Sequence, residues 1–467
     1  MTPHSRRSFL RTGALAALGL GAAGDSARAS TSRLPRVGIV GGGLSGVACA
    51  WLLDGVADSF LFESRSSLGG HAHTIPVAVG GETLFVDVGA QFFAPGPHPM
   101  YTKLLELIGL TSPGNPADDA TVEAEMSITV TETGQSIPRF VSPMSDRYWT
   151  ILTPWNREAL IAFSVFALAA RAFTESGDWL VPLDTWLERL PVEPELREGL
   201  LLPLLSAMAG CSIEEARGLS ARSALFFVGR ALPENLLSPF LYNHSLYGLQ
   251  GNLRYLAGIC GNLTTYLGSN VTEIQPLSGG GLAIANGAGV VETVDVAILA
   301  TPPYVTRSLL PRRVALVEAR ALMERFDYFH AEISIHRDPV YMPERRLYWS
   351  AYNPILAGAY CEASIWYGAL RPVPAGQAPL MLFKSWATAR EQSPRTELFR
   401  REFLHPRITP DFIRAQRRLA PLQGREDLWL AGSYTLPVDS QESALVSAMN
   451  VVRELDPEAP NLVALES

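Results

Sequence analysis

The sequence predicts an α/β fold built around a parallel, Rossmann-like sheet, and three observations support this prediction. An apolar run at residues 36–40 leads into a glycine-rich turn at 41–46, which opens an alanine- and leucine-rich helix. A second apolar run over 59–62 ends at an acidic residue, Glu63. Near the other end of the chain, the strand-like residues 428–431 stop at a glycine, and a helical pattern follows over about 441–455. Residues 332–336 and 346–352 are also expected to form strands. Strands and helices that alternate in this way form parallel sheets.

The composition is that of a globular protein and excludes several classes of function. Of the 467 residues, 47% are hydrophobic and 18% are charged, which excludes a wholly disordered chain. The formal net charge of −8 implies no basic face, so no nucleic-acid partner is expected. The four cysteines lie far apart and form no cluster with histidines, so no metal site is predicted.

Residues 1–29 are predicted to be a cleaved export signal. The paired Arg6 and Arg7, followed by Phe9 and an apolar run, resemble a twin-arginine signal, and residues 27–29 fit a signal-peptidase site. We therefore expect cleavage after Ala29 and a periplasmic or otherwise exported protein. The apolar run is too short to span a bilayer. The alternative is a disordered tail with chance arginines.

The residue types in the glycine-rich turn suit the diphosphate of a dinucleotide. Gly41 permits the tight turn, Gly43 lets a diphosphate approach the backbone, and Gly46 lets the helix pack closely on the strand. The helix N-terminus at Leu44 and Ser45 presents free N–H groups to the phosphates. The alternative is a glycine-rich turn without a ligand.

The segment that begins at Glu63 shifts the expected cofactor from NAD to FAD. Glu63 is placed to accept hydrogen bonds from ribose hydroxyls, and its charge argues against NADP. Residues 63–71, Glu-Ser-Arg-Ser-Ser-Leu-Gly-Gly-His, resemble the E-x-R-x-x-x-G-G-R/H element of two-domain flavoproteins. That resemblance implies that the backbone of Gly69 and Gly70 meets the diphosphate, with Arg65 and His71 as additional donors. A surface position is the alternative for the histidine.

Two further segments resemble parts of the same flavoprotein fold. Residues 87–93 resemble the segment that brings the backbone to the flavin ring, and residues 428–432 resemble the closing strand. The helix after that strand would aim its positive end at the flavin. Together these pieces are more specific than any one of them.

The chain as a whole resembles the flavin-containing amine oxidase and phytoene desaturase superfamily. It is most similar to bacterial NAD/FAD-binding oxidoreductases related to the N-terminal half of plant cyclopropane fatty-acid synthases. Shared phrases lie at residues 68–74, 336–349 and 415–424, and the resemblance covers about 36–456. It implies a two-domain, amine-oxidase-like FAD-binding fold with a discontinuous substrate domain of mixed sheet and helices.

The resemblance implies a division of the mature chain into alternating pieces of two domains. The FAD-binding domain is expected at 36–110, 240–305 and 425–460, and the substrate domain at 111–239, which is helical, and 306–424. The cofactor-binding residues predicted from the motifs and the resemblance are Gly41, Gly43, Leu44, Ser45, Gly46, Glu63, Ser64, Arg65, Gly69, Gly70, His71, Gly89, Ala90, Gln91, Phe92, Val271, Gly432, Ser433, Glu442 and Ala444.

The pattern breaks where amine oxidases carry out their chemistry. Those enzymes place a lysine, bridged by water to flavin N5, on a strand that corresponds here to residues 330–334. The place of that lysine falls at Ala331, and His330 beside it could point inward, because a one-residue shift exchanges the faces of a strand. The chain has only two lysines, Lys103 and Lys384, and Lys384 lies too far along to be assigned to this role.

The C-terminal helix departs from the pattern as well. Amine oxidases carry there one of the aromatic side chains that sandwich the amine, where this chain has Ser440. The close relatives carry His-Glu-Asp-Gly, of which only Glu442 is retained. The candidates for groups near the flavin are His330, Glu442, Gln91 and Trp349, each of which could instead be structural.

These observations predict an exported FAD-dependent oxidoreductase. The resemblance also implies non-covalent FAD, because the family's covalent flavin link uses a cysteine near the C-terminal helix and no cysteine follows Cys361 here. A hydride would pass from a lipid- or polyene-like substrate, or from an amine, to flavin N5, with O₂ or a quinone as electron acceptor. The alternatives are a true flavin amine or amino-acid oxidase, a non-catalytic flavin-binding partner module, and an NAD-dependent dehydrogenase. The apolar stretch 160–173 is expected to be a buried helix, with peripheral membrane contact as the alternative and a full span excluded by its length.

Overall fold

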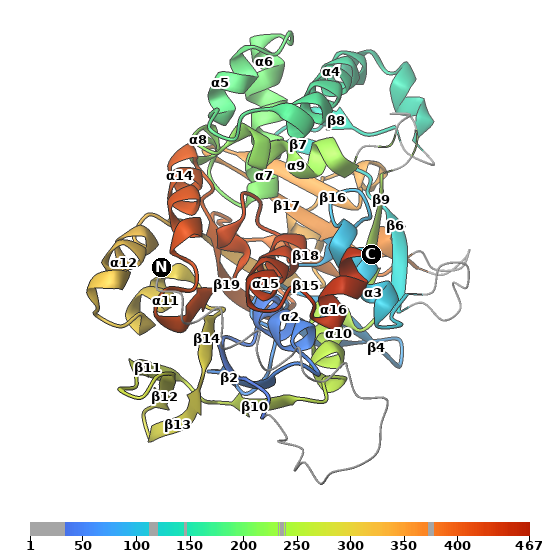
Figure 1. Ribbon diagram of the computed structural model, residues 1–467. Helices are drawn as coiled ribbons and strands as arrows, with labels where there is room; N and C mark the ends of the chain where they lie inside the picture. Colours follow the sequence, from blue (N-terminus) through green and yellow to red (C-terminus); the bar gives the residue numbers. More distant parts are fainter. Residues whose placement is uncertain are drawn as a thin grey trace.

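The computed structural model describes residues 33–111, 120–143, 147–231, 233, 238, 240–371 and 378–467. The predicted export signal lies outside the described residues, so cleavage and export stay predictions. Figure 1 shows a lower part around the parallel sheet, a larger sheet across the middle, and a helical unit at the top.

The predicted parallel sheet is confirmed. Its five strands lie in the order β10-β2-β1-β14-β20, and every neighbouring pair is parallel. Residues 37–40 of the central strand are buried, as expected when helices and a second sheet cover both faces. The strands are β1 (Arg36–Val40), β2 (Asp58–Glu63), β10 (Leu263–Leu267), β14 (Val296–Leu299) and β20 (Leu428–Leu430).

Helices cover one face of this sheet. Helix α2 follows β1 directly, and its apolar residues, among them Val47 and Leu52, share a buried core with Leu445 and Val452 of the C-terminal helix α15. The helix predicted over 441–455 is therefore confirmed. The helices on this side are α2 (Leu44–Leu52), α3 (Pro99–Leu107), α10 (Gly248–Gly258), α15 (Gln441–Leu455) and α16 (Pro460–Glu466).

A small antiparallel sheet covers the other face. Gly38 of β1 makes this packing possible, because a Cβ there would overlap the side chain of Ile284. Further helices extend the same core. These elements are β11 (Val271–Pro276), β12 (Leu282–Asn286), β13 (Gly289–Val294), α11 (Pro303–Leu309), α12 (Val317–Met323) and α14 (Pro410–Leu419).

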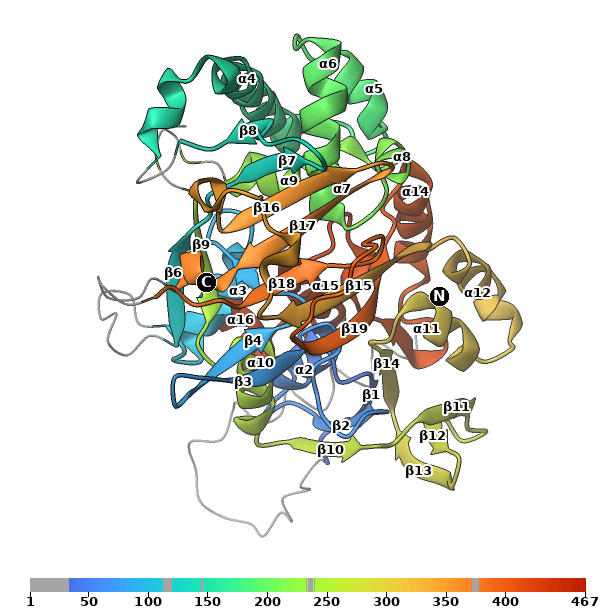
Figure 2. The same ribbon diagram turned by 180° about the vertical axis from the view of Figure 1, so that it is seen from behind.

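The second large sheet has seven strands in the order β19-β15-β18-β17-β16-β7-β8, and Figure 2 shows it from behind, below the helical unit. The strand predicted over 332–336 is confirmed as part of β15. The strands are β7 (Thr129–Glu132), β8 (Phe140–Val141), β15 (Tyr328–His336), β16 (Tyr352–Ala357), β17 (Tyr360–Trp366), β18 (Phe383–Trp386) and β19 (Glu397–Pro406).

The strand expected over 346–352 is wrong. The structure has a 3₁₀ turn at Arg346–Tyr348, and β16 begins only at Tyr352. The indole N–H of Trp349 donates to the carbonyl of Pro343 at 2.7 Å, and its ring is buried. This contact helps to hold the chain in a compact turn, which the aromatic content of the segment did not reveal.

The helical unit contains α4 (Pro154–Ser176), α5 (Leu183–Glu188), α6 (Pro194–Leu196), α7 (Leu202–Ala209), α8 (Ile213–Arg217) and α9 (Ala221–Ala231). The buried face of α4 includes Phe166, Ala167 and Ala170, which lie in one core with Leu225 of α9. The helix has 23 residues, which is long enough to cross a bilayer, so the expectation that its length excludes a membrane span is wrong. Length and composition would allow α4 to cross a membrane, a test that core helices also pass.

Two small sheets and a short helix complete the fold. One sheet pairs β3 (Thr74–Val79) with β4 (Glu82–Asp87), and the other orders β5 (Phe92–Phe93), β9 (Leu241–Ser245) and β6 (Thr121–Glu125) as β5-β9-β6. The short helix is α13 (Tyr367–Leu370). Between β4 and β5, residues 88–91 pass from the parallel-sheet part toward the seven-stranded sheet.

Candidate dinucleotide and substrate site

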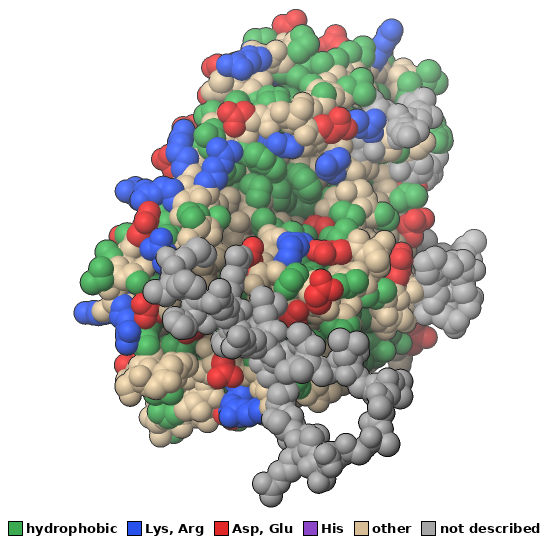
Figure 3. Space-filling view, in the orientation of Figure 1, with side chains coloured by type: hydrophobic (Ala, Val, Ile, Leu, Met, Phe, Trp, Pro, Cys, Tyr) green, Lys and Arg blue, Asp and Glu red, His purple; other side chains and the backbone are tan. Residues whose placement is uncertain are grey.

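A cavity of about 820 Å³ connects the parallel sheet to the seven-stranded sheet. One end is lined by the glycine-rich turn and the other by apolar side chains of the helical unit. On the face shown in Figure 3 the surface is hollowed below the upper helices, and hydrophobic side chains gather there.

The glycine-rich turn leaves room for a ligand at one position. A Cβ on Gly46 would overlap the carbonyl oxygen of Gly41, so this glycine serves close packing of α2 on β1. Gly41 has a φ of +113°, which favours glycine. A Cβ on Gly43 would meet only the Cα of Gly70, at 3.9 Å. The space above Gly43 is therefore free for a diphosphate.

The N-terminus of α2 and the end of β2 meet at the same place. Helix α2 begins at Leu44 without a side-chain cap and without an acid in its first turn, so its N–H groups are available to an anion. The Glu63 carboxylate is buried and accepts hydrogen bonds from the N–H groups of Gly42 and Arg65, both at 2.8 Å. The carboxylate thus binds both the glycine-rich turn and the loop after β2, and its remaining lone pairs can accept hydrogen bonds from ribose hydroxyls.

A second glycine loop faces the first. Gly69 and Gly70 have φ values of +156° and +60°. The N–H of Gly69 donates to the carbonyl of Gly42 at 2.9 Å, and the backbone of Gly70 lies against Gly43. His71 lies in the cavity wall, with its ring 6.3 Å from that of His405. Burial lowers the pKa of His71, so its imidazole is neutral at pH 7 and donates through one ring nitrogen only.

Lys384 reaches the segment where the flavin ring is expected, which corrects the sequence interpretation. It lies on β18, directly opposite Ile335 of β15, so strand pairing brings it to the site. Its buried ammonium donates to the carbonyl of Gly89 at 2.6 Å and to the side-chain oxygen of Gln91 at 3.3 Å. The number of residues between Lys384 and Ala331 concealed that they lie on adjacent strands.

The charge of Lys384 depends on its burial and on Asp87. Burial lowers the pKa of Lys384 to about 8, and the nearby Asp87 carboxylate opposes that shift. Burial raises the pKa of Asp87 to about 7, against the hydrogen bond from Thr74 and the charge of the lysine. The lysine therefore exchanges its proton within the pH range in which enzymes work.

His330 does not reach the cavity. Alternate residues of β15 point to opposite faces of the sheet, and Ala331 and Ile333 are buried on the face that meets the cavity. His330 points to the other face, where its side chain is 70% exposed and pairs with Glu402. Its prediction as a group near the flavin does not fit this position, because the register of the strand turns it away.

Glu442 and Trp349 also lie outside the cavity lining. The Glu442 carboxylate accepts hydrogen bonds from the N–H groups of Met100 and Tyr101, at 3.0 and 2.8 Å, and so caps helix α3. Trp349 packs against Phe383 and Trp366 in a separate apolar cluster. Both side chains have structural partners that account for them, whereas Gln91 is buried at the site beside Lys384.

The structure brings nearly all predicted cofactor residues to one cavity. Two of the predicted residues do not line it: Gly46 lies behind the glycine-rich turn, and Glu442 caps helix α3. The predicted positions that line the cavity are Gly41, Gly43, Leu44, Ser45, Glu63, Ser64, Arg65, Gly69, Gly70, His71, Gly89, Ala90, Gln91, Phe92, Val271, Gly432, Ser433 and Ala444.

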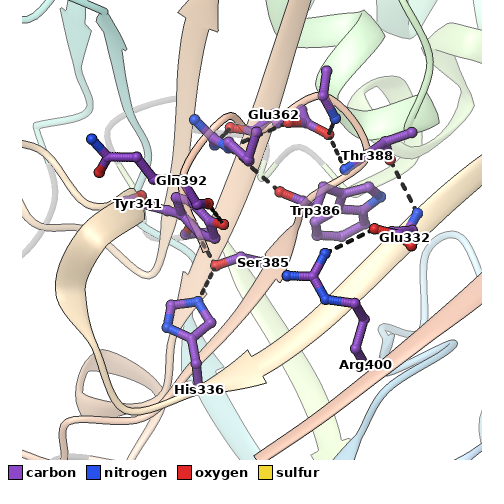
Figure 4. Close-up of polar contacts among 12 residues, drawn as sticks. Glu332, His336, Tyr341, Glu362, Ser385, Trp386, Thr388, Gln392 and Arg400 are labelled. Atoms are coloured by element: carbon purple, nitrogen blue, oxygen red, sulfur yellow. Dashed lines mark hydrogen bonds and ion pairs between the residues drawn. The ribbon is translucent and has the colours of Figure 1, made fainter. Parts of the chain in front are cut away.

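The opposite face of the seven-stranded sheet carries a separate polar network (Figure 4). His336 Nε2 lies 2.9 Å from the hydroxyl of Ser385, which lies 2.7 Å from that of Ser364, and all three side chains are buried. Nearby, Arg400 donates to Glu332 at 2.8 Å. These groups face away from the cavity, and their hydrogen bonds join the neighbouring strands β15, β18 and β17.

The far end of the cavity is mainly apolar, with Tyr352 and Trp386 as the polar exceptions on the strands. Side chains from the helical unit and from the seven-stranded sheet close it, and they offer shape and dispersion contacts rather than hydrogen bonds. Sequence inspection singled out only the stretch 160–173, which contributes Phe163, because the other residues come from segments that are far apart along the chain. They include Met126, Phe163, Leu204, Met208, Phe227, Phe240 and Ile365.

Comparison with known proteins supports the architecture. The NAD(P)-binding Rossmann-like domain family matches residues 39–107, which include both glycine loops. A candidate protoporphyrinogen oxidase from an Exiguobacterium species superposes with a TM-score of 0.62 at 16% identity, covering 91% of this chain and 99% of that one. Wild-type putrescine oxidase gives a TM-score of 0.59 at 15% identity, with coverages of 92% and 99%.

The chain has the amine oxidase fold. Cyclohexylamine oxidase from Brevibacterium oxydans also superposes, with a TM-score of 0.55 at 16% identity and coverages of 92% and 99%. A fatty acid isomerase from P. acnes that produces CLA reaches 0.62 at 12% identity, with coverages of 90% and 98%. A comparison with curated protein sequences finds no match.

Proposed function

We propose that this protein is an FAD-dependent oxidoreductase that acts on an apolar small molecule. The observation that supports it most is the single cavity that begins at the glycine loops, passes Lys384 and ends among apolar side chains. One end of this cavity suits a dinucleotide and the other a hydrophobic substrate.

FAD suits the residues at the polar end. The free space above Gly43, the uncapped N-terminus of α2 and the carboxylate of Glu63 provide for the diphosphate and the ribose. The backbone of Gly89 to Gln91 would border the flavin ring. All four cysteines lie outside the cavity lining, which supports non-covalent binding.

Lys384 is the group we propose to move a proton. Removing two hydrogens from an apolar substrate takes away a hydride and a proton, and bound FAD would supply the hydride acceptor. The ammonium of Lys384 is held by Gly89 and Gln91, and its deprotonated form can accept the proton. O₂ or a quinone is the proposed final electron acceptor.

The substrate class follows from the apolar lining. Because Met126, Phe163, Met208 and Phe240 offer no hydrogen-bonding partner beyond a thioether, a lipid- or polyene-like molecule is the first candidate. An amine is the second, and the buried Lys384 favours it, because amine oxidases carry a lysine near the flavin. Structures of two amine oxidases and a fatty acid isomerase share the fold.

We also propose that the protein is exported and contacts a membrane peripherally. The twin-arginine-like signal at residues 1–29 supports export. Helix α4 presents Phe163 to the cavity and the exposed side chains of Ile161 and Leu168 to the opposite side. An apolar outer face on a helix that also lines the cavity suits a substrate taken from a lipid surface.

Anaerobic titration of the flavin-loaded protein tests the substrate class. We expect long-chain or polyene substrates to bleach the visible flavin bands, because they fill the apolar end of the cavity. Readmitting O₂ or adding a quinone should restore the colour. Bleaching by small amines alone would overturn this order and favour an amine oxidase. A photoreduced flavin that no acceptor reoxidises would contradict the enzymatic proposal itself.

A further inference from the structure

Two arginines that are adjacent in sequence lie on opposite faces of strand β19. Arg400 lies on the face away from the cavity and donates to Glu332 and Glu397, at 2.8 and 2.9 Å. Arg401 lies on the cavity face, in register with Ile333 of β15. The two side chains therefore have opposite surroundings, although they differ by one position.

Arg401 reaches the wall that carries the second glycine loop. Its guanidinium carbon lies 4.8 Å from the centre of the Phe403 ring, which in turn lies 5.9 Å from the ring of His71. His71 directly follows Gly70. Arg401, from the sheet of the predicted substrate domain, thus faces the loops expected to hold the diphosphate.

Among the described residues Arg401 has no anionic partner. It forms no ion pair with them and donates no hydrogen bond to them, although its side chain is partly buried. Arg65 lies close enough that its positive charge adds to burial in lowering the pKa of Arg401. Two arginines that share a cavity wall repel each other, and partial removal from water makes an unpaired guanidinium less favourable.

A diphosphate satisfies both arginines. It carries negative oxygens on two phosphorus atoms, and a guanidinium binds such oxygens with paired, charge-assisted hydrogen bonds. Both arginines line the cavity that holds the free space above Gly43. An anion in this cavity is therefore within the reach of the dinucleotide loops on one side and β19 on the other.

We propose that Arg401 is a cofactor-binding residue that, with Arg65, binds the diphosphate of the dinucleotide. The inference rests on the proposed FAD site and adds a residue from the opposite sheet to it. FAD would then link the two large sheets, so its binding should stabilise both parts of the molecule against unfolding.

The test compares Arg401→Gln with Arg400→Gln as the matched control. The dissociation constant of FAD is measured from recovered flavin fluorescence on dilution of the loaded protein, at low and high salt. We expect Arg401→Gln to weaken FAD binding by about ten- to a hundredfold and to reduce its salt dependence. Arg400→Gln should leave both unchanged. Arg401→Lys, which keeps the charge, should retain part of the affinity.

Competing ligands identify the group that Arg401 contacts. ADP-ribose contains the diphosphate without the flavin, and riboflavin contains the flavin without phosphate. The dissociation constant of ADP-ribose, obtained from the competition after correction for the affinity of FAD, should rise in Arg401→Gln, whereas that of riboflavin should stay unchanged. Unaltered FAD affinity in Arg401→Gln would overturn the inference and leave the FAD site intact. Weaker binding of palmitate to the loaded protein, with FAD affinity unchanged, would also overturn it and assign the arginine to a substrate carboxylate.

Discussion

Replacing Lys384 with methionine is expected to lower kcat by at least about a hundredfold while FAD stays bound, the scale typical of losing a positioned proton acceptor. Methionine keeps the length and apolar stem of the side chain but removes the nitrogen that contacts Gly89 and Gln91. Turnover of the substrate found by anaerobic titration and the flavin content of the purified variant are the two measurements. Turnover close to that of the wild type would exclude Lys384 from the chemistry.

Lys103 supplies the control variant, and the scarcity of lysine allows the protonation of Lys384 to be measured directly. Lys103 lies on α3, and Lys103→Met should leave turnover unchanged. Because the chain has only these two lysines, lysine-labelled protein gives two side-chain resonances, and Lys384→Met removes one of them. The resonance of Lys384 should titrate near pH 8, and turnover should rise through the same range as the amine loses its proton.

Asp87→Asn should move this titration further down. The Asp87 carboxylate raises the pKa of Lys384, so its neutralisation leaves burial unopposed. The asparagine oxygen can still accept the hydrogen bonds from Thr74 and the N–H of Leu249. An unchanged Lys384 titration in this variant would show that the two groups do not interact.

Gly43→Val is expected to abolish FAD binding in a protein that still folds. Gly43 has φ −80° and ψ −177°, which any residue can adopt, and a Cβ there meets only Gly70 at 3.9 Å. The side chain of the valine would therefore enter the space proposed for the diphosphate, and its Cβ has only Gly70 within 4 Å. Flavin content and thermal unfolding of the purified variant measure the two effects.

Gly46→Val should instead lower the stability of the fold more than the affinity for FAD. Its Cβ overlaps the carbonyl oxygen of Gly41, so the fold is destabilised by about 1–3 kcal/mol or more. A Gly43→Val protein with wild-type flavin content would contradict the placement of the cofactor over the turn.

The sequence predicted the dinucleotide end well because its signals are local. The strand, turn and helix at 36–52 and the acidic end of β2 are short-range patterns, and the structure has them as β1, α2 and β2. Gly43 and Gly70 are each recognisable from neighbours along the chain, and tertiary structure only brings the two loops together.

The position of Lys384, which carries the proposed proton transfer, could not be predicted in the same way, because it depends on strand order and register. The place of the amine-oxidase lysine was assigned to Ala331 on β15, whereas the adjacent strand β18 brings Lys384 to the cavity. His330 required a choice between the two faces of β15, which only the register decides. The rarity of lysine in the chain was the one sequence signal that pointed to Lys384.

Glu442 shows the limit of reading a retained residue as functional. It is the one position of the relatives' helix motif that this chain keeps, yet its carboxylate caps α3 through the N–H groups of Met100 and Tyr101. A structural contact between segments more than three hundred positions apart explains its presence, and no local pattern could indicate that contact.

The visible absorption spectrum of the purified protein, before and after heat denaturation, tests the central claim most directly. The account predicts flavin bands in the native protein and free FAD in the supernatant after denaturation, because the cofactor is held without a covalent bond. A colourless protein that does not take up added FAD would contradict it, and the glycine loops would then belong to an NAD site or to a fold that has lost its cofactor.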